Sequence, residues 1–98
     1  MKFIAYWEGN PYDAEKIMKK TMNLEQTAKM NIEEAKKYPK SISANYNISG
    51  RRGFMLIEAD NDEQMMNLAL YFFPELTFEF VAIYELAKAA SEWQKIKK

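Results

Sequence analysis

Residues 50–84, GRRGFMLIEADNDEQMMNLALYFFPELTFEFVAIY, contain the segment that decides the fold. Phe54–Ala59 is an apolar run that follows Gly53 and ends before the polar residues 60–62. A run of this length is too short for a free-standing helix, and unbroken apolarity is typical of an inner strand that is covered on both faces. The sequence therefore predicts a strand at Phe54–Ala59 near the middle of a sheet.

A helix and another strand are expected directly after this strand. Asp60 lies where a helix N-cap is expected, and Glu63 three residues later completes the pattern of a capping box. The helix is expected to end before Pro74, because proline cannot continue a helix. Leu76–Tyr84 then begins with alternating apolar and polar residues, which is typical of a strand. The apolar side of the helix is formed at three- and four-residue spacings by Met65, Met66, Leu68, Ala69, Phe72 and Phe73.

The first 37 residues predict a matching strand and helix. Lys2–Glu8 is aromatic and apolar on both faces, as expected for another central strand. Asn10 followed by proline is a favourable helix start, and the helix is predicted over Pro11–Lys37. Asn23 and Asn31 are weak helix formers, so they are the two positions at which a bend or break would be no surprise. The positions predicted to face the core are Ala14, Ile17, Thr21, Leu24, Ala28, Ile32 and Ala35.

Two further segments complete the predicted secondary structure. Ser41–Ser49 alternates strictly between apolar and polar residues, which predicts a strand with one buried face. Its inward residues are expected to be Ile42, Ala44, Tyr46 and Ile48. The sequence after Tyr84 predicts a terminal helix. Its apolar side would carry Leu86, Ala90, Trp93 and Ile96.

The hairpin between the second and third predicted strands has two candidate registers. The preferred register places Tyr46 opposite Ile57 and Asn45 opposite Glu58, because it keeps apolar residues on one face. A one-residue bulge at Gly53 would instead place Tyr46 opposite Glu58.

The predicted order of elements is strand, helix, strand, strand, helix, strand, with a C-terminal helix. This α+β order is the ferredoxin-like split βαβ arrangement (βαββαβ), which gives a four-stranded antiparallel sheet with two helices on one face. Three of the strands also carry apolar residues on the other face, and a large uncovered apolar face is typical of an interface. Residues 1–98 are therefore expected to form a single domain that dimerises sheet to sheet.

The composition excludes several classes of function. The chain contains 14 basic and 14 acidic residues, so no excess charge favours nucleic acid or anionic membranes. It contains neither cysteine nor histidine, which excludes thiol and imidazole catalysis and the usual zinc ligands. No apolar run is long enough for a signal peptide or a membrane span. We expect a cytoplasmic protein with no metal, no cofactor, no nucleic acid and no membrane partner.

Several short motifs resemble one known family. They are the segment RGFMLIEADNDEQ at residues 52–64, the segment PELTFEF at residues 74–80 and the pair Trp7-Glu8. Together they resemble an uncharacterised prokaryotic family of stand-alone domains of unknown function, which is placed with the dimeric α+β barrels. Members can carry a Trp-His pair in the second strand, where this chain has Asn45-Tyr46-Asn47. The resemblance implies the fold and dimerisation, and it implies no established activity.

Glu58 is the candidate catalytic residue. A carboxylate near the end of an apolar strand is costly to bury without a partner, and burial would raise its pKa towards a range useful for proton transfer. Asn45 is its predicted neighbour, and Trp7 and Glu79 are expected near the same strand ends. The alternative interpretation is that Glu58 lies in water or pairs with a lysine.

Four aromatic residues are candidate ligand contacts. Trp7, Tyr46, Phe72 and Trp93 are expected to line a cavity for a flat apolar ligand, as in the cofactor-free monooxygenases of the resembled superfamily. The alternative is that these aromatic side chains form an ordinary core.

An RNA-recognition motif has the same order of elements, and Arg52-Gly53-Phe54 matches the start of its third-strand signature. The following residues lack the required small and aromatic positions, and the net charge is zero. RNA binding is therefore not expected.

The sequence predicts a homodimer that binds a small apolar or aromatic molecule. Any enzymatic chemistry is expected to be cofactor-independent, of the isomerase, decarboxylase or monooxygenase type. Glu58 would transfer a proton, while Asn45 and Tyr46 would orient a carbonyl group. The alternative is a non-catalytic ligand-sensing or assembly module that acts through its sheet-to-sheet dimer, and the sequence does not decide between enzyme and module.

Overall fold

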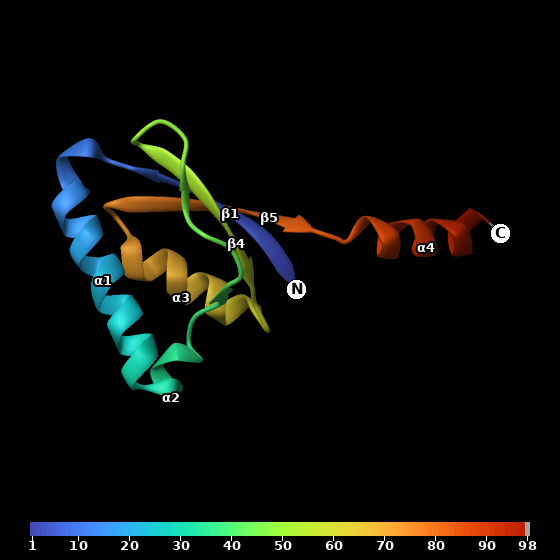
Figure 1. The fold of residues 1–98 in the computed structure, drawn as a ribbon, viewed down its shortest axis with the longest axis horizontal. Coiled ribbons are helices and arrows are strands. Elements are labelled where there is room, and N and C mark those ends of the chain that lie inside the picture. The colour runs from blue at the N-terminus through green and yellow to red at the C-terminus, as the bar shows by residue number, and fades with distance from the viewer. Residues whose placement is uncertain (98) are drawn as a thin grey trace.

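The computed structural model describes residues 1–97, which form a mixed α+β structure with five strands and four α-helices. Figure 1 shows α1, α2 and α3 grouped beside the sheet, whereas α4 projects away from it. The elements are β1 (Lys2–Gly9), a 3-10 turn (Pro11–Asp13), α1 (Ala14–Met30), α2 (Ile32–Ala35), β2 (Lys40–Ser41), β3 (Tyr46–Asn47), β4 (Arg52–Glu58), α3 (Asp62–Phe72), β5 (Leu76–Ile83) and α4 (Leu86–Lys97).

The strands form one open sheet in the order β2-β4-β1-β5, and β3 also pairs with β4. All of these pairs are antiparallel. Over residues 1–97 the sheet has five strands, so the prediction of four was wrong. The predicted strands at Lys2–Glu8 and Phe54–Ala59 do lie inside the sheet, as β1 and β4, and Leu76–Ile83 forms its edge as β5.

The extra strand results from a break in the predicted second strand. Residues 42–45 separate β2 from β3, and the pairing with β4 shifts by two residues across this break. The Ile42 amide donates to the Leu56 carbonyl at 2.9 Å, and the Leu56 amide donates to Ser43 Oγ at 2.8 Å. Because a serine side chain takes the place of a backbone acceptor, the chain bulges without leaving the central strand unpaired.

Both predicted hairpin registers were wrong. Tyr46 lies opposite Phe54 and Asn47 lies opposite Gly53, three residues away from the preferred register. The turn forms early because Asn47 Oδ1 accepts the Gly50 amide at 2.5 Å, and Gly50 has φ 77°, which glycine adopts readily. A shift by an odd number of residues exchanges the two faces of a strand. Tyr46 therefore stacks on Phe54 on the outer face instead of entering the core.

Helix α3 begins one residue later than predicted. Asn61 is its N-cap and accepts the Gln64 amide at 2.9 Å, so the prediction of Asp60 as the cap was wrong. Gln64 Oε1 accepts the Asp60 amide at 2.7 Å, and the Gln64 side chain is buried. The arrangement resembles a capping box, except that the glutamine side chain reaches the amide of the residue before the N-cap. The neutral amide of Gln64 is less costly to bury than a carboxylate.

The long predicted first helix is broken. Asn10 accepts the Tyr12 amide and Pro11 follows it, as expected, but the first turn is 3-10 in character. The predicted break occurs at Asn31, which ends α1 and caps α2.

The two faces of the sheet differ in what covers them. The inner face carries the core, in which Ala5, Ile57, Leu68, Phe72 and Leu76 are buried. The outer face, defined here by Ile4, Tyr6, Tyr46, Phe54, Leu56, Val81 and Ile83, has no helix of residues 1–97 over it. No helix within residues 1–97 is long and apolar enough to cross a lipid bilayer.

Candidate functional site: an apolar pocket between α1 and the sheet

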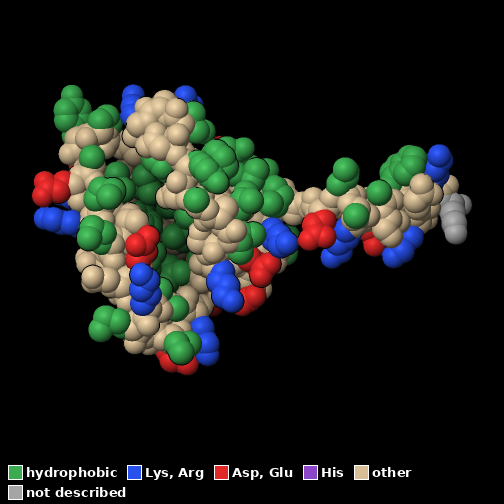
Figure 2. All heavy atoms as spheres, viewed as in Figure 1, with side chains coloured by type: hydrophobic (Ala, Val, Ile, Leu, Met, Phe, Trp, Pro, Cys, Tyr) green, Lys and Arg blue, Asp and Glu red, His purple; other side chains and the backbone are tan. Residues whose placement is uncertain are grey.

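A pocket of about 600 Å³ lies between α1 and the inner face of the sheet. Figure 2 shows it as a hollow lined by hydrophobic side chains beside the helices. Its size is within the range of small-molecule sites, and its walls are mostly apolar. The walls include Trp7 and Phe78 from the sheet, Ile17, Thr21, Leu24 and Ala28 from α1, Phe72 from α3 and Tyr38, Ser43 and Asn45 from the segments after α2.

The pocket exists because α1 stands away from the sheet. None of the 17 residues of α1 is buried, whereas α3 buries Gln64, Leu68 and Phe72. The side of α1 that faces the sheet is apolar, so its residues were predicted to lie in the core. Ile17 and Leu24 do pack against the core, and with Thr21 and Ala28 they also line the pocket, whereas Ala14 is exposed.

Polar contacts hold α1 in this raised position. The Tyr71 hydroxyl of α3 donates to the Lys20 carbonyl at 3.0 Å, and the Lys20 ammonium pairs with Glu75 at 3.0 Å. The hydrogen bond from Lys20 is the main reason that the pKa of the Glu75 carboxyl lies below its usual value. These contacts join α1 to α3 and to the start of β5, which keeps the wall of the pocket at a fixed distance.

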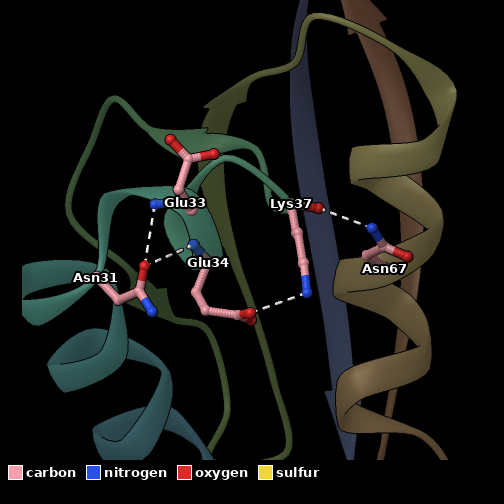
Figure 3. Close-up of polar contacts among 5 residues, drawn as sticks. All are labelled: Asn31, Glu33, Glu34, Lys37 and Asn67. Carbon is pink, nitrogen blue, oxygen red and sulfur yellow. Dashed lines mark hydrogen bonds and ion pairs between the residues drawn. The ribbon is translucent and has the colours of Figure 1, made fainter.

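Helix α2 contributes Ala35 to the lining of the pocket. Figure 3 shows polar contacts before and after this helix. Asn31 Oδ1 accepts the Glu33 and Glu34 amides at 3.1 and 3.2 Å. At the other end, Asn67 Nδ2 of α3 donates to the Lys37 carbonyl at 2.9 Å. Gln64 of α3 makes the same kind of contact with the neighbouring Lys36 carbonyl at 2.9 Å. These four hydrogen bonds form a clamp that fixes the direction in which the chain continues into the pocket wall.

Tyr38 follows this clamp and lines the pocket. Its ring packs edge-on against Tyr71, with centroids 5.9 Å apart. Partial burial is the main reason that the pKa of the Tyr38 hydroxyl is raised, and Tyr71 and Glu34 raise it further. Tyr38 is therefore a neutral hydrogen-bonding group in a mostly apolar wall.

Trp7 forms the sheet side of the pocket mouth. Its Nε1 donates to Asn45 Oδ1 at 2.7 Å, so the indole is oriented by the segment that breaks the second strand. The ring passes over Gly53, its partner on β4. A Cβ atom at Gly53 would overlap the Trp7 ring and the Tyr46 carbonyl oxygen. The absence of a side chain at Gly53 is what gives the indole its place.

The structure brings together some of the predicted site residues. Trp7, Asn45 and Phe72 line the pocket. Tyr46 and Glu79 lie on the opposite face of the sheet, and Trp93 lies on the projecting α4.

Glu58 also lies away from the pocket. It is exposed at the end of β4, where its Cα partners are Lys2 and Lys40, so the alternative interpretation, in which Glu58 lies in water, is the one that the structure supports. The expected contact with Asn45 was wrong for the same reason as the register, because the early turn at Asn47 moves Asn45 along the strand.

Sequence reasoning missed the contribution of α1 and of Tyr38. The apolar side of α1 was visible as a helical repeat, but this repeat does not distinguish a packed helix from one that borders a cavity. Among residues 1–97 no buried side-chain nitrogen or oxygen lacks a hydrogen-bond partner. Within the same residues, no cluster of three or more acidic side chains is placed to hold a metal ion.

Comparisons with curated proteins and with solved structures found no match to this chain. One family model, described as a domain of unknown function (DUF3303), matches residues 1–97. Because the match covers nearly the whole sequence, the chain belongs to this family of domains of unknown function.

Proposed function

We propose that the pocket between α1 and the sheet binds a small, predominantly apolar molecule. The proposal rests on a cavity of about 600 Å³ beneath the apolar side of α1. The side chains that line this cavity leave it unfilled. A packed interior normally leaves few voids larger than a water molecule. Burial of an apolar ligand in such a cavity contributes roughly 25 cal/mol for each Å² removed from water.

The lining also indicates the chemistry of the ligand. Trp7, Phe72 and Phe78 offer aromatic surfaces, and the indole nitrogen of Trp7 is already bonded to Asn45. No buried polar side chain within residues 1–97 lacks a partner, so no such group demands a polar ligand atom. The hydroxyl of Tyr38 and the polar side chains at the mouth provide orientation, while apolar contact provides the affinity.

We propose ligand binding, rather than catalysis, as the role of the pocket. Glu58, the residue expected to transfer a proton, is exposed on the other side of the sheet from the pocket. Glu25 and Tyr38 are acid-base groups in the pocket wall, and Tyr38 has a raised pKa. A raised tyrosine pKa favours hydrogen-bond donation over proton abstraction, which is suited to holding a ligand.

Dye binding tests the proposal. N-phenyl-1-naphthylamine, an uncharged aromatic dye whose fluorescence rises in apolar surroundings, is titrated into the wild type and two variants. Ala28→Phe places a ring in the pocket, whereas Gln26→Phe places the same ring on an exposed part of α1. We expect Ala28→Phe to weaken binding by about tenfold or more, equivalent to about 1.4 kcal/mol, and Gln26→Phe to leave it unchanged. Equal affinities for both variants, or no saturable binding to the wild type, would remove the proposal.

We further propose that β2 and β3 are two halves of one interrupted strand. With that reading the chain follows the ferredoxin-like split βαβ order, and the antiparallel pairing of β1 with both β4 and β5 supports it. The same fold dimerises in the α+β barrels that the sequence resembles. We propose a homodimer in which the outer faces of two sheets meet, and this surface would serve the alternative role of an assembly module.

The exposed side chains of the outer face support the dimer. Val81 is 41% exposed and Tyr46 is 53% exposed, although both are large and apolar in a sheet whose inner face is packed. Sedimentation equilibrium of the wild type, of Val81→Glu and of Ser49→Glu in the exposed turn measures the association. We expect a dimer for the wild type and Ser49→Glu and a monomer for Val81→Glu. A monomeric wild type at every concentration would refute the dimer.

A further inference from the structure

Helix α4 lies apart from the body of the protein. All 12 residues from Leu86 to Lys97 are exposed, and Figures 1 and 2 show the helix projecting beyond the end of the sheet. Near its start Lys2 pairs with Glu85 at 3.4 Å, and the Ala89 amide donates to the Glu85 carbonyl. An isolated helix of this length is marginal in water, so α4 needs a surface to pack against.

One side of α4 is suited to such a surface. Apolar residues recur at three- and four-residue spacings and form a stripe along the helix. Trp93 is 55% exposed, whereas Leu86 and Ile96 are more than 80% exposed. Lys88, Glu92 and Lys95 occupy the opposite side, and the Lys97 ammonium lies over the Trp93 ring, 4.7 Å from its centroid. The stripe consists of Leu86, Ala89, Ala90, Trp93 and Ile96.

The charge of the chain is divided between α4 and the body. Four lysines and one glutamate follow Glu85 in the sequence, so the terminal segment has a net charge of +3. Residues 1–85 contain 10 basic and 13 acidic residues, which gives the body a net charge of −3. The whole chain is neutral, yet its two parts attract each other electrostatically. A second copy of the chain therefore offers α4 both an apolar face and an acidic body.

We propose that α4 of one copy packs its apolar stripe on the outer face of a second copy, at the margin of the dimer interface. The inference rests on the proposed dimer and is independent of the ligand pocket. Only Tyr84 and Glu85 connect β5 to α4, and Figure 1 shows the helix pointing away from its own sheet. By two-fold symmetry each copy gives one helix and receives one, so the exchange covers both stripes and the margins of both outer faces.

Cysteine crosslinking tests the exchange directly, because the natural chain contains no cysteine. Two differently tagged full-length chains are co-expressed, one with Ala90→Cys in the stripe and the other with Val81→Cys or Tyr46→Cys on the outer face. We expect a disulfide between the two chains on a non-reducing gel for at least one outer-face position. The control is Ser91→Cys on the polar side of α4, which should form at least tenfold less crosslinked product.

Three results would overturn the exchange. They are no crosslink at either outer-face position, an equal yield for Ser91→Cys, and a disulfide within one chain that carries both Ala90→Cys and Val81→Cys. The last result would mean that α4 folds back on its own sheet.

The contribution of α4 to association is measured separately by comparing Trp93→Glu with Gln94→Glu. Loss of a buried interface tryptophan is expected to raise the dimer Kd by about 30-fold or more, whereas Gln94→Glu should leave it within about threefold. A wild-type dimer that Trp93→Glu leaves unchanged would refute the exchange and retain the dimer. A monomeric wild type would refute both.

Discussion

Gly53 is the residue on which the pocket mouth depends most directly. Its missing side chain leaves space for the Trp7 indole, and Trp7 in turn bonds to Asn45. We expect Gly53→Ala to displace the indole and to lower the free energy of unfolding by about 1–3 kcal/mol, as overpacking commonly does. The dye affinity should fall with it. Urea denaturation and dye titration measure the two effects.

Gly9→Ala is the matched control for this prediction. Gly9 is also a strand glycine, but an added Cβ would meet only the methyl ends of Ile17 and Leu76, at 3.1 Å. These flexible side chains can adjust, so we expect a smaller loss of stability than in Gly53→Ala. If the two variants were equally stable, the indole would not be confined by Gly53.

The ion pair between Lys20 and Glu75 predicts a specific pH dependence. The pKa of Glu75 is lowered in the folded state from an ordinary value of 4.5, so the unfolded chain binds this proton more tightly. The stabilisation is complete above pH 4.5 and is lost as the pH falls through the lowered folded-state pKa. Glu75→Gln should therefore flatten the decline of stability below pH 4.5, as measured by urea denaturation across the acid range.

Glu15→Gln is the control, because the Lys19–Glu15 pair is almost fully exposed. Exposed pairs contribute little to stability, so this variant should follow the wild-type pH profile. A Glu75→Gln profile that matched the wild type would show that the pair does not hold α1.

At the scale of elements, Asn31 decides that α1 and α2 are separate helices. Its side chain accepts two amides of α2, and its own amide donates to the Thr27 carbonyl. We expect Asn31→Ala to lower the free energy of unfolding by about 1 kcal/mol, the usual cost of losing a helix cap. Thermal or urea unfolding gives this value.

Asn23→Ala, in the same helix, is expected to change the free energy of unfolding in the opposite direction. Asn23 lies exposed in the interior of α1, where alanine has the higher helix propensity, so this variant should gain stability by up to about 0.7 kcal/mol. Stabilisation by Asn31→Ala as well would mean that the break is not set by the cap.

The sequence predicted the elements better than their junctions. The strands at β1, β4 and β5 and the helices at α3 and α4 follow from apolar periodicity, because that pattern is local. Apolar and polar residues alternate so regularly in the second predicted strand that its apolar face can pair with β4 in several registers. Two hydrogen bonds in which the side chains of Ser43 and Asn47 accept backbone amides select another pairing. The Ser43 contact depends on the neighbouring strand and the Asn47 contact is confined to the turn, so neither leaves a periodic trace in the sequence.

The candidate site was predictable in part for a related reason. Trp7 and Phe72 were found because inward aromatic residues on β1 and α3 must lie near each other. The stand-off of α1 depends on Tyr71, Lys20 and Glu75, which belong to three different elements, and no spacing in the chain reveals it. Glu58 was placed wrongly because its expected partner depended on the hairpin register.

At the scale of the whole molecule, the pocket and the proposed interface lie on opposite faces of the same sheet. The side chains of a strand alternate between faces, so the two surfaces share strands but no side chains. We therefore expect Val81→Glu to abolish the dimer and to leave the affinity for N-phenyl-1-naphthylamine within about twofold, which is about 0.4 kcal/mol. Dye titration of the Val81→Glu variant, after sedimentation equilibrium has shown that it is a monomer, measures this affinity. A larger change in affinity would mean that the two faces are coupled.

The broken second strand has a consequence for aggregation. On that edge of the sheet, β2 and β3 are two residues long each, and the bulge between them interrupts the row of free backbone groups. A short, bulged edge is a poor template for an incoming strand. The opposite edge, β5, is an uninterrupted strand of eight residues, LTFEFVAI. The addition of further strands, which is the route to amyloid, is thus hindered at the edge formed by β2 and β3. The edge formed by β5 is the one at which a fibril of this protein would grow.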